Sequence, residues 1–121
     1  MENKTLTLKI PTQSANLLAY ALELYVRLNL GQLHELHNNF CDKDYDIESL
    51  EYALTQAKIL IFPELDSCSS YGIYNKDVKE DVKVIHDIYK EIKHKLCDNP
   101  MSTHFGEVLR ASDIDMKVEV E

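Results

Sequence analysis

Arginine and glutamine side chains flank a glycine near the end of a predicted helix. Arg27 and Gln32 lie on either side of Gly31, and a glycine in such a pattern often breaks a helix. Backbone groups at a helix end lack partners within the helix and can meet a ligand, while an arginine can bind a phosphate through two parallel hydrogen bonds. The segment therefore carries donors for a phosphate or ribose group. A solvated ion pair between Arg27 and Glu23, four residues earlier, is the favoured alternative.

Three side chains that zinc prefers lie close together in the next segment. On a helix, His34, His37 and Cys41 would share one face and could converge on a metal ion. The chain has neither the HExxH pattern of zinc peptidases nor a CxxC half-site. We therefore expect solvated or core-edge histidines and no metal.

Acidic residues recur as two pairs with a spacing of three, Glu48 with Glu51 and Asp77 with Glu80. Two such pairs on facing helices could hold Mg²⁺. They resemble the all-helical nucleoside triphosphate pyrophosphohydrolases, which implies a Mg-dependent nucleotide hydrolase as a weaker alternative. However, that family has ExxD where this chain has DxxE, and its further upstream acid is missing. Both pairs also fall in predicted first helical turns, where the helix dipole favours acids.

Motifs for covalent or phosphate chemistry are absent from the sequence. There is no GxSxG nucleophile pattern, and the chain has three glycines in total, too few for a glycine-rich phosphate loop. We therefore expect a binding protein without a cofactor rather than an enzyme.

Charge and length narrow the classes of partner. The chain has 121 residues, which predicts a single domain spanning 1–121. Its formal net charge is −8, and Arg27 and Arg110 are its two arginines. General nucleic-acid binding needs a basic surface and is not expected. An acidic surface instead suits a basic partner, or simply solubility.

The sequence predicts a cytoplasmic protein that does not bind a membrane. Its beginning lacks the pattern of a secretory signal, and its longest strongly apolar run, residues 59–62, is far too short to cross a bilayer. Three widely spaced cysteines, Cys41, Cys68 and Cys97, favour reduced thiols over a disulfide framework.

Hydrophobic periodicity predicts a mainly α fold with a minor β ribbon, an α+β class. Alternation over residues 5–10 and 115–120 indicates two short terminal strands that pair with each other. Between them we expect about four helices: residues 12 to 28 or 30 with Thr12 as N-cap, 32–40, 47–61 after an Asp44 or Asp46 cap and before Pro63, and 78–96 after an Asn75 or Asp77 cap, ended by residues 98–100.

The first of these helices is apolar around most of its circumference. One stripe contains Leu17, Ala21, Leu24 and Leu28, and a second stripe beside it contains Leu18, Leu22 and Tyr25. A helix of this kind is either central or shared with another chain. Since one small helical domain cannot readily cover both stripes, we expect a homo-oligomer.

Two stretches of the chain resemble a group of small uncharacterised proteins that are common in phages and prophages. The first carries the pattern L-Y-x-R-x-x-x-G-Q, from Leu24 to Gln32. The second carries D-I-Y-x-x-I-[RK]-H, from Asp87 to His94, and follows Tyr71-Gly72-Ile73, which also matches the group. The resemblance implies a short strand, a helix that ends in the first pattern and a later helix, together with a phage or prophage context.

Phages carry small oligomeric proteins that counter host defence, and some of these sequester nucleotide signals without cleaving them. The resemblance therefore suggests a homo-oligomer in the host cytoplasm that binds a small nucleotide-derived ligand in an aromatic-lined pocket with a few cationic donors. The expected contacts are Arg27 and Gln32 to phosphate or ribose, Tyr25 or Tyr71 to a base, and His94 or Arg110 to complete the pocket.

An inhibitor or adaptor that acts on another protein is the alternative from a different functional class. Twenty-one acidic residues against thirteen basic ones would let an acidic face dock a basic host protein. The two hypotheses predict different companions for the purified chain, a small molecule in the first case and a basic protein in the second.

Overall fold

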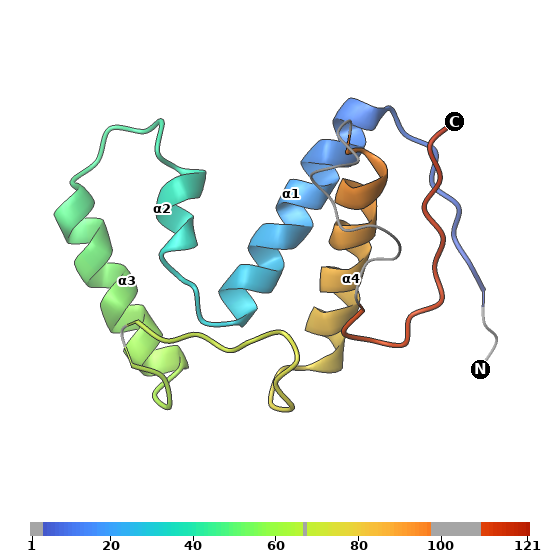
Figure 1. Cartoon of the computed structure of the whole chain (residues 1–121). Coiled ribbons are helices and arrows are strands. Elements are labelled where there is room, and N and C mark those ends of the chain that lie inside the picture. Colours follow the sequence, from blue (N-terminus) through green and yellow to red (C-terminus); the bar gives the residue numbers. More distant parts are fainter. Residues whose placement is uncertain (1–3, 67, 98–109) are drawn as a thin grey trace.

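A computed structural model describes residues 4–66, 68–97 and 110–121. Within these residues the chain forms four helices: α1 (Thr12–Asn29), α2 (Glu35–Asn39), α3 (Ile47–Ile61) and α4 (Glu80–Lys95). Figure 1 shows α1 and α4 side by side and antiparallel, while α2 and α3 form an arm on the opposite side of α1 from α4. The predicted mainly helical architecture is confirmed.

Helix α1 begins directly after a proline and ends at a glycine. Pro11 occupies the N-cap position and no side chain caps the helix, so Thr12 is the first helical residue and not the predicted cap. At the other end, Gly31 has a φ of +95°, a conformation that glycine adopts without strain. The N–H groups of Gly31 and Gln32 donate to the carbonyls of Leu28 and Arg27, at 3.2 and 3.0 Å. These two bonds are the Schellman motif that closes many helices.

The other helices begin and end at partly predicted signals. Asp46 caps α3 by accepting hydrogen bonds from the backbone of Glu48 and Ser49, and Pro63 follows shortly after the end of the helix. For α4 the helix is present as predicted, but the predicted cap was wrong. Its N-cap is Lys79, which makes no side-chain cap bond, because the Asn75 side chain instead accepts from the N–H of Asp77 in the preceding turn. The predicted end of α4 at residues 98–100 lies outside the described residues.

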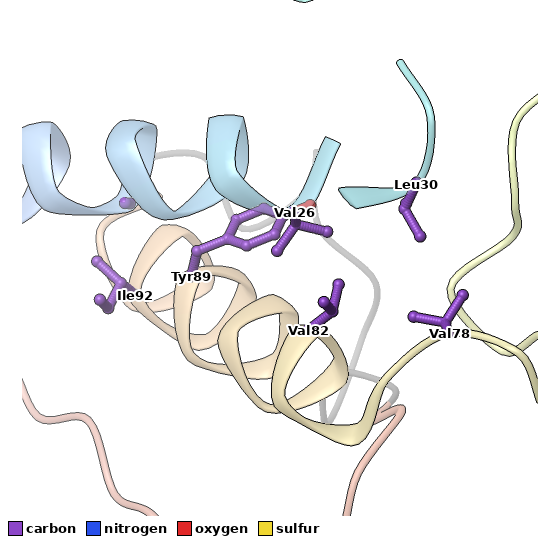
Figure 2. Close-up of a cluster of buried hydrophobic side chains, with 7 residues drawn as sticks. Val26, Leu30, Val78, Val82, Tyr89 and Ile92 are labelled. Atoms are coloured by element: carbon purple, nitrogen blue, oxygen red, sulfur yellow. The ribbon is translucent and has the colours of Figure 1, made fainter. Parts of the chain in front are cut away.

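The core lies between α1 and α4. Figure 2 shows the Tyr89 ring of α4 directed toward Val26 of α1, with other buried apolar side chains along the same seam. The buried members of this cluster are Ala19, Val26, Leu30, Val78, Val82, Tyr89 and Ile92. Burying these side chains between the two antiparallel helices, with Leu30 just after α1 and Val78 just before α4, is the main apolar contribution to the stability of the fold.

Neither predicted apolar stripe of α1 is its buried face, because Ala19 and Val26, the buried residues of this helix, lie outside both. In one stripe Leu18 and Leu22 are half-buried against the core but Tyr25 is 47% exposed. In the other stripe Leu17 is 73% exposed, as Tyr20 beside it is at 53%, whereas Leu24 and Leu28 are half-buried. A single copy therefore leaves an apolar strip of α1 open to water.

Neither terminal strand is present in the part of the chain that the structure describes. Residues 4–11 and 113–121 are extended and lie beside each other in Figure 1, and Lys9 and Glu121 approach to 3.9 Å, yet no regular ladder joins them. Leu6 and Leu8 are 90% and 62% exposed, so the apolar face of the expected ribbon is not covered. An isolated two-stranded ribbon without such cover is marginal in water.

Candidate functional site

Arg27 is held by two carboxylates. Its Nε and Nη2 atoms donate to one oxygen of Glu23 at 3.1 and 2.8 Å, and its Nη1 donates to Glu35 at 3.0 Å. The ion pair with Glu23 is the one that the helical spacing predicted, whereas Glu35 comes from the next helix. A phosphate at Arg27 would therefore have to compete with two carboxylates for the guanidinium.

Glu23 also accepts a hydrogen bond from Lys93 of α4, at 3.0 Å. Burial alone would raise the pKa of Glu23, but hydrogen bonds and positive charge from Lys93 and Arg27 outweigh it and hold this pKa below its ordinary value. We call Glu23, Arg27, Glu35 and Lys93 the Glu23 cluster. It contains two acids and two bases, and it links α1 to α2 and to α4.

The end of α1 offers an anion little attraction. Two of its terminal carbonyls are already bonded to Gly31 and Gln32, and the C-terminal end of a helix carries partial negative charge. A small hollow of about 250 Å³ lies beside this end, lined by Tyr20, Glu23, Leu24, Arg27, Glu35 and Asn38. This hollow presents two carboxylates and one guanidinium, a balance that does not favour a phosphate.

The other predicted contacts at this end do not line that hollow. The Tyr25 side chain is exposed, and Gln32 is half-buried just after the helix. Tyr71 is fixed in the local core: its N–H donates to the Leu30 carbonyl at 2.8 Å and its hydroxyl donates to Glu64 at 2.8 Å. The structure thus gives Tyr71 the core-capping position that the sequence also allowed.

His94 and Arg110 lie together in a larger groove. The groove has a volume of about 950 Å³ and runs between the C-terminal half of α4 and the segment after residue 109. Its lining residues are Glu91, His94, Lys95, Arg110, Ser112, Asp113, Ile114, Met116, Lys117, Val118, Glu119 and Val120. We call it the α4 groove. Two of the six predicted ligand contacts, His94 and Arg110, meet in this groove. Its lining also contains two lysines, Lys95 and Lys117.

Arg110 is braced across the α4 groove. Its Nη2 donates to Glu91 at 3.2 Å and its Nη1 donates to the carbonyl of Ile114 at 2.9 Å. A guanidinium has five N–H donors, so within the described residues these contacts leave further donors for a ligand. The bracing contacts also fix the plane in which those donors point.

A buried carboxylate holds the outer wall of the α4 groove. Asp87 is 1% exposed and accepts hydrogen bonds from the backbone N–H groups of Ala111 and Ser112, both at 2.8 Å, from the Ser112 hydroxyl, and from Nδ1 of His86. Sequence reasoning missed this anchor. Asp87 lies on the side of α4 opposite the stripe of Val82 and Tyr89, so hydrophobic periodicity gave no signal that this carboxylate would be buried.

Comparisons with family models, curated proteins and solved structures returned no match to this chain. The phage-protein resemblance therefore stays a prediction that depends on its two sequence patterns. The structure gives several of their residues a structural role. Gly31 turns the chain at the end of α1, Asp87 anchors the C-terminal segment, and Tyr89 fills the core.

His34 and His37, two of the three residues considered as metal ligands, each contact polar side chains of neighbouring segments. His34 lies 3.5 Å from a carboxylate oxygen of Glu51 and 3.4 Å from the Thr55 hydroxyl, while Nδ1 of His37 lies 2.5 Å from the Tyr45 hydroxyl. Among the described residues, no three or more potential metal ligands lie together in a group that could hold a metal ion. The structure does not bring His34, His37 and Cys41 together.

The two acidic pairs are placed on separate parts of the molecule. Glu48 and Glu51 lie on α3, whereas Asp77 precedes α4 and Glu80 is its first residue. Among the described helices, α3 packs against α2 and makes no contact with α4. Helix packing therefore does not create the facing acidic pairs that a bridging Mg²⁺ requires.

Across the described residues, none of the helices combines enough length with enough apolar character to cross a bilayer.

Proposed function

We propose that this protein binds a small anionic, nucleotide-derived ligand in the α4 groove and performs no chemistry on it. The observation that carries the proposal is the convergence of His94 and Arg110 on one groove of about 950 Å³, which is large enough for a ligand of that class. The Arg27 side of the predicted site is less suited, because Glu23 and Glu35 already hold its guanidinium.

The charge of the α4 groove differs from that of the chain as a whole. The chain carries a formal charge of −8, but the groove lining has Lys95, Arg110 and Lys117 to set against its three carboxylates. His94 adds an imidazole that can donate to a phosphate oxygen. An anion is therefore opposed less here than over the acidic remainder of the surface.

In this proposal the protein acts as a cytoplasmic phage-type sponge that removes a nucleotide signal by binding it. The outward strip of α1, with Leu17, Tyr20 and Tyr25 about half or more exposed, supports the accompanying expectation of a homo-oligomer.

The first test is to identify what the purified protein carries. Heating the protein, removing the precipitate and analysing the supernatant by mass spectrometry should reveal a phosphate-bearing small molecule. Calorimetric titration of the emptied protein with the released compound should then show one site per chain. A supernatant without any such compound, together with no binding across a panel of linear and cyclic nucleotides, would refute the proposal.

The two arginines provide a matched pair of variants. Arg110→Ala removes a guanidinium from the α4 groove and should weaken binding by about tenfold or more, as expected for the loss of a charge-assisted hydrogen bond. Arg27→Ala removes the same group from the Glu23 cluster and should leave affinity unchanged. An equal loss of affinity in the two variants would show that the ligand does not bind in the α4 groove.

A second candidate function is docking on a basic protein. The connection between α2 and α3 exposes Asp42, Asp44 and Asp46, with Glu48 just beyond them, and only Lys43 offsets this charge. If this surface docks a basic host protein, a pull-down from host lysate should retain one stoichiometric basic protein. The Asp42→Lys, Asp44→Lys double variant should lose it. If the wild type and the double variant retain the basic protein equally well, this acidic surface is not the docking site.

A further inference from the structure

Helix α3 is poorly covered for a helix of its length. It has 15 residues, and of the described helices it contacts only the five-residue α2. Figure 1 shows it at the edge of the molecule, separated by α2 from α1 and α4. Because helices of this length are marginal on their own in water, most of their stability comes from packing of an apolar face.

The side of α3 that faces α2 is accounted for. Leu54 and Lys58 are buried, Leu50 is half-buried, and Glu51 lies beside His34. On the opposite side, residues of similar polarity recur seven positions apart. Tyr52 is followed by Ile59, Ala53 by Leu60, and Ser49 by Gln56. A seven-residue repeat of this kind is typical of a helix that packs along another helix.

This outer face is exposed, largely apolar and uncharged. Tyr52, Ile59 and Leu60 are 70%, 53% and 82% exposed, and Ser49, Ala53 and Gln56 are exposed between them. This face carries no carboxylate or ammonium group, although 28% of the residues in the chain are charged. It offers no charge complementarity to a strongly basic or strongly acidic partner.

A second copy of the chain fits this face better than a charged partner does. Two molecules with a net charge of −8 each repel one another, and they can approach most closely where neither presents a carboxylate. The outer face of α3 meets that condition, as does the outward strip of α1 around Leu17 and Tyr20. The acidic loop of residues 42–46 and the start of α4 do not.

We propose that two copies associate through the outer faces of their α3 helices, which pack antiparallel about a two-fold axis at Gln56. In this arrangement Tyr52 of each copy lies beside Leu60 of the other, and the small Ala53 faces the bulky Ile59. The two Gln56 amides meet at the axis, where each can both donate and accept a hydrogen bond. This inference rests on the homo-oligomer of the proposed function and is independent of its ligand.

The decisive measurement is molecular mass in solution. Light scattering and sedimentation at tens of micromolar should show a mass of at least twice 14.0 kDa. Leu60→Glu should raise the dissociation constant by about 100-fold or more, because a carboxylate would be buried opposite apolar groups. Leu60 is exposed in the single chain, so the variant should keep its helical circular dichroism.

Leu17→Glu is the matched control, since Leu17 is also a strongly exposed leucine but lies on α1. It should leave the α3 dimer intact. A wild-type monomer at all concentrations would overturn the dimer and the proposed oligomer alike. An oligomer that survives Leu60→Glu but dissociates with Leu17→Glu would overturn this interface alone and place the contact on α1. Neither result depends on nucleotide binding, which is measured separately by mass spectrometry of the compound released on heating.

Cysteine cross-linking tests the orientation of the two helices. A Gln56→Cys chain should form a disulfide with its own copy under mild oxidation, because the two positions meet at the axis. An equimolar mixture of Tyr52→Cys and Leu60→Cys chains should cross-link between the two kinds of chain, as mass spectrometry of the joined peptides would show. Cross-linking of Tyr52→Cys chains with one another instead would mean a parallel pair and refute the antiparallel arrangement.

Discussion

The carboxylate of Asp87 binds Ser112, a residue 25 positions later in the chain, through both the backbone N–H at 2.8 Å and the side-chain hydroxyl. The N–H of Ala111 donates to its other oxygen at 2.8 Å. Asp87 therefore fixes the start of the C-terminal segment against α4, and with it the position of Arg110 beside Glu91. One buried side chain thus connects the stability of the fold to the shape of the α4 groove.

Replacing Asp87 should detach the C-terminal segment. We expect Asp87→Ala to lower the free energy of unfolding by about 2–3 kcal/mol, because several buried hydrogen bonds are lost and their donors are left without a partner. Ser112→Ala removes only the hydroxyl bond and should cost about 1 kcal/mol. Urea unfolding followed by circular dichroism measures both. Proteolysis of the C-terminal segment should accelerate in Asp87→Ala before α4 unfolds; equal resistance in the two variants would contradict an anchor at Asp87.

The same carboxylate makes stability depend on pH. Burial would raise the pKa of Asp87, but hydrogen bonds from Ala111, Ser112 and His86 outweigh it, so the pKa lies below its ordinary value. The unfolded chain then binds the proton more readily than the folded one. The contribution of Asp87 to stability is therefore complete above about pH 5 and is lost progressively as the pH falls through the unfolded-state pKa and then the depressed pKa.

The urea midpoint of the wild type should therefore fall more steeply than that of Asp87→Asn between about pH 5 and pH 3. Glu23, whose pKa is also depressed, adds to the slope in both proteins and cancels from the comparison. Parallel slopes for the two proteins would show that the Asp87 carboxylate is not stabilised in the folded state.

Two glycines allow a matched test of the end of α1. At Gly31, with its positive φ, an added Cβ would lie 2.7 Å from Cδ1 of Leu65. Gly31→Ala should destabilise the fold by about 1–2 kcal/mol from the left-handed backbone alone, with a further cost from displacing Leu65. At Gly72 an added Cβ meets nothing within 4 Å, so Gly72→Ala should be neutral or slightly stabilising. Thermal unfolding of the two variants measures the difference, and equal melting temperatures would refute the helix-end geometry.

The caps of α3 and α4 offer a second matched pair. Asp46→Ala removes the acceptor for the N–H groups of Glu48 and Ser49, so we expect the melting temperature to fall. Lys79 occupies the same position before α4 but makes no side-chain cap bond, and Lys79→Ala should leave the melting temperature unchanged. A larger effect at Lys79 than at Asp46 would contradict the assignment of the caps.

Local signals in the sequence predicted the helices well. The Asp46 cap and Pro63 bracket α3, and the proline and glycine around α1 fix its observed bounds of Thr12–Asn29. Each of these signals acts within a few residues of the helix end, so periodicity and turn chemistry are sufficient to find them. The terminal strands failed because alternation predicts a face but supplies no partner to cover it.

Features that depend on distant residues could not be found in this way. The partners of Asp87 lie 24 and 25 residues further along the chain, and no pattern connects them. The buried residues of α1, Ala19 and Val26, lie outside both predicted stripes, because a helix that is apolar around most of its circumference does not reveal from spacing which side meets α4. For Arg27, spacing found Glu23 but not Glu35, which the turn after Gly31 brings back to the same guanidinium.

The arm that contains α2 and α3 leaves and rejoins the molecule at one point, where the N–H of Tyr71 donates to the carbonyl of Leu30 at 2.8 Å. A segment whose two ends are adjacent can be lengthened, exchanged or removed with little disturbance to the rest of the fold. The arm can therefore diverge in evolution at a different rate from the α1–α4 pair. Related chains should conserve the lengths of α1 and α4 while their arms vary in size and surface.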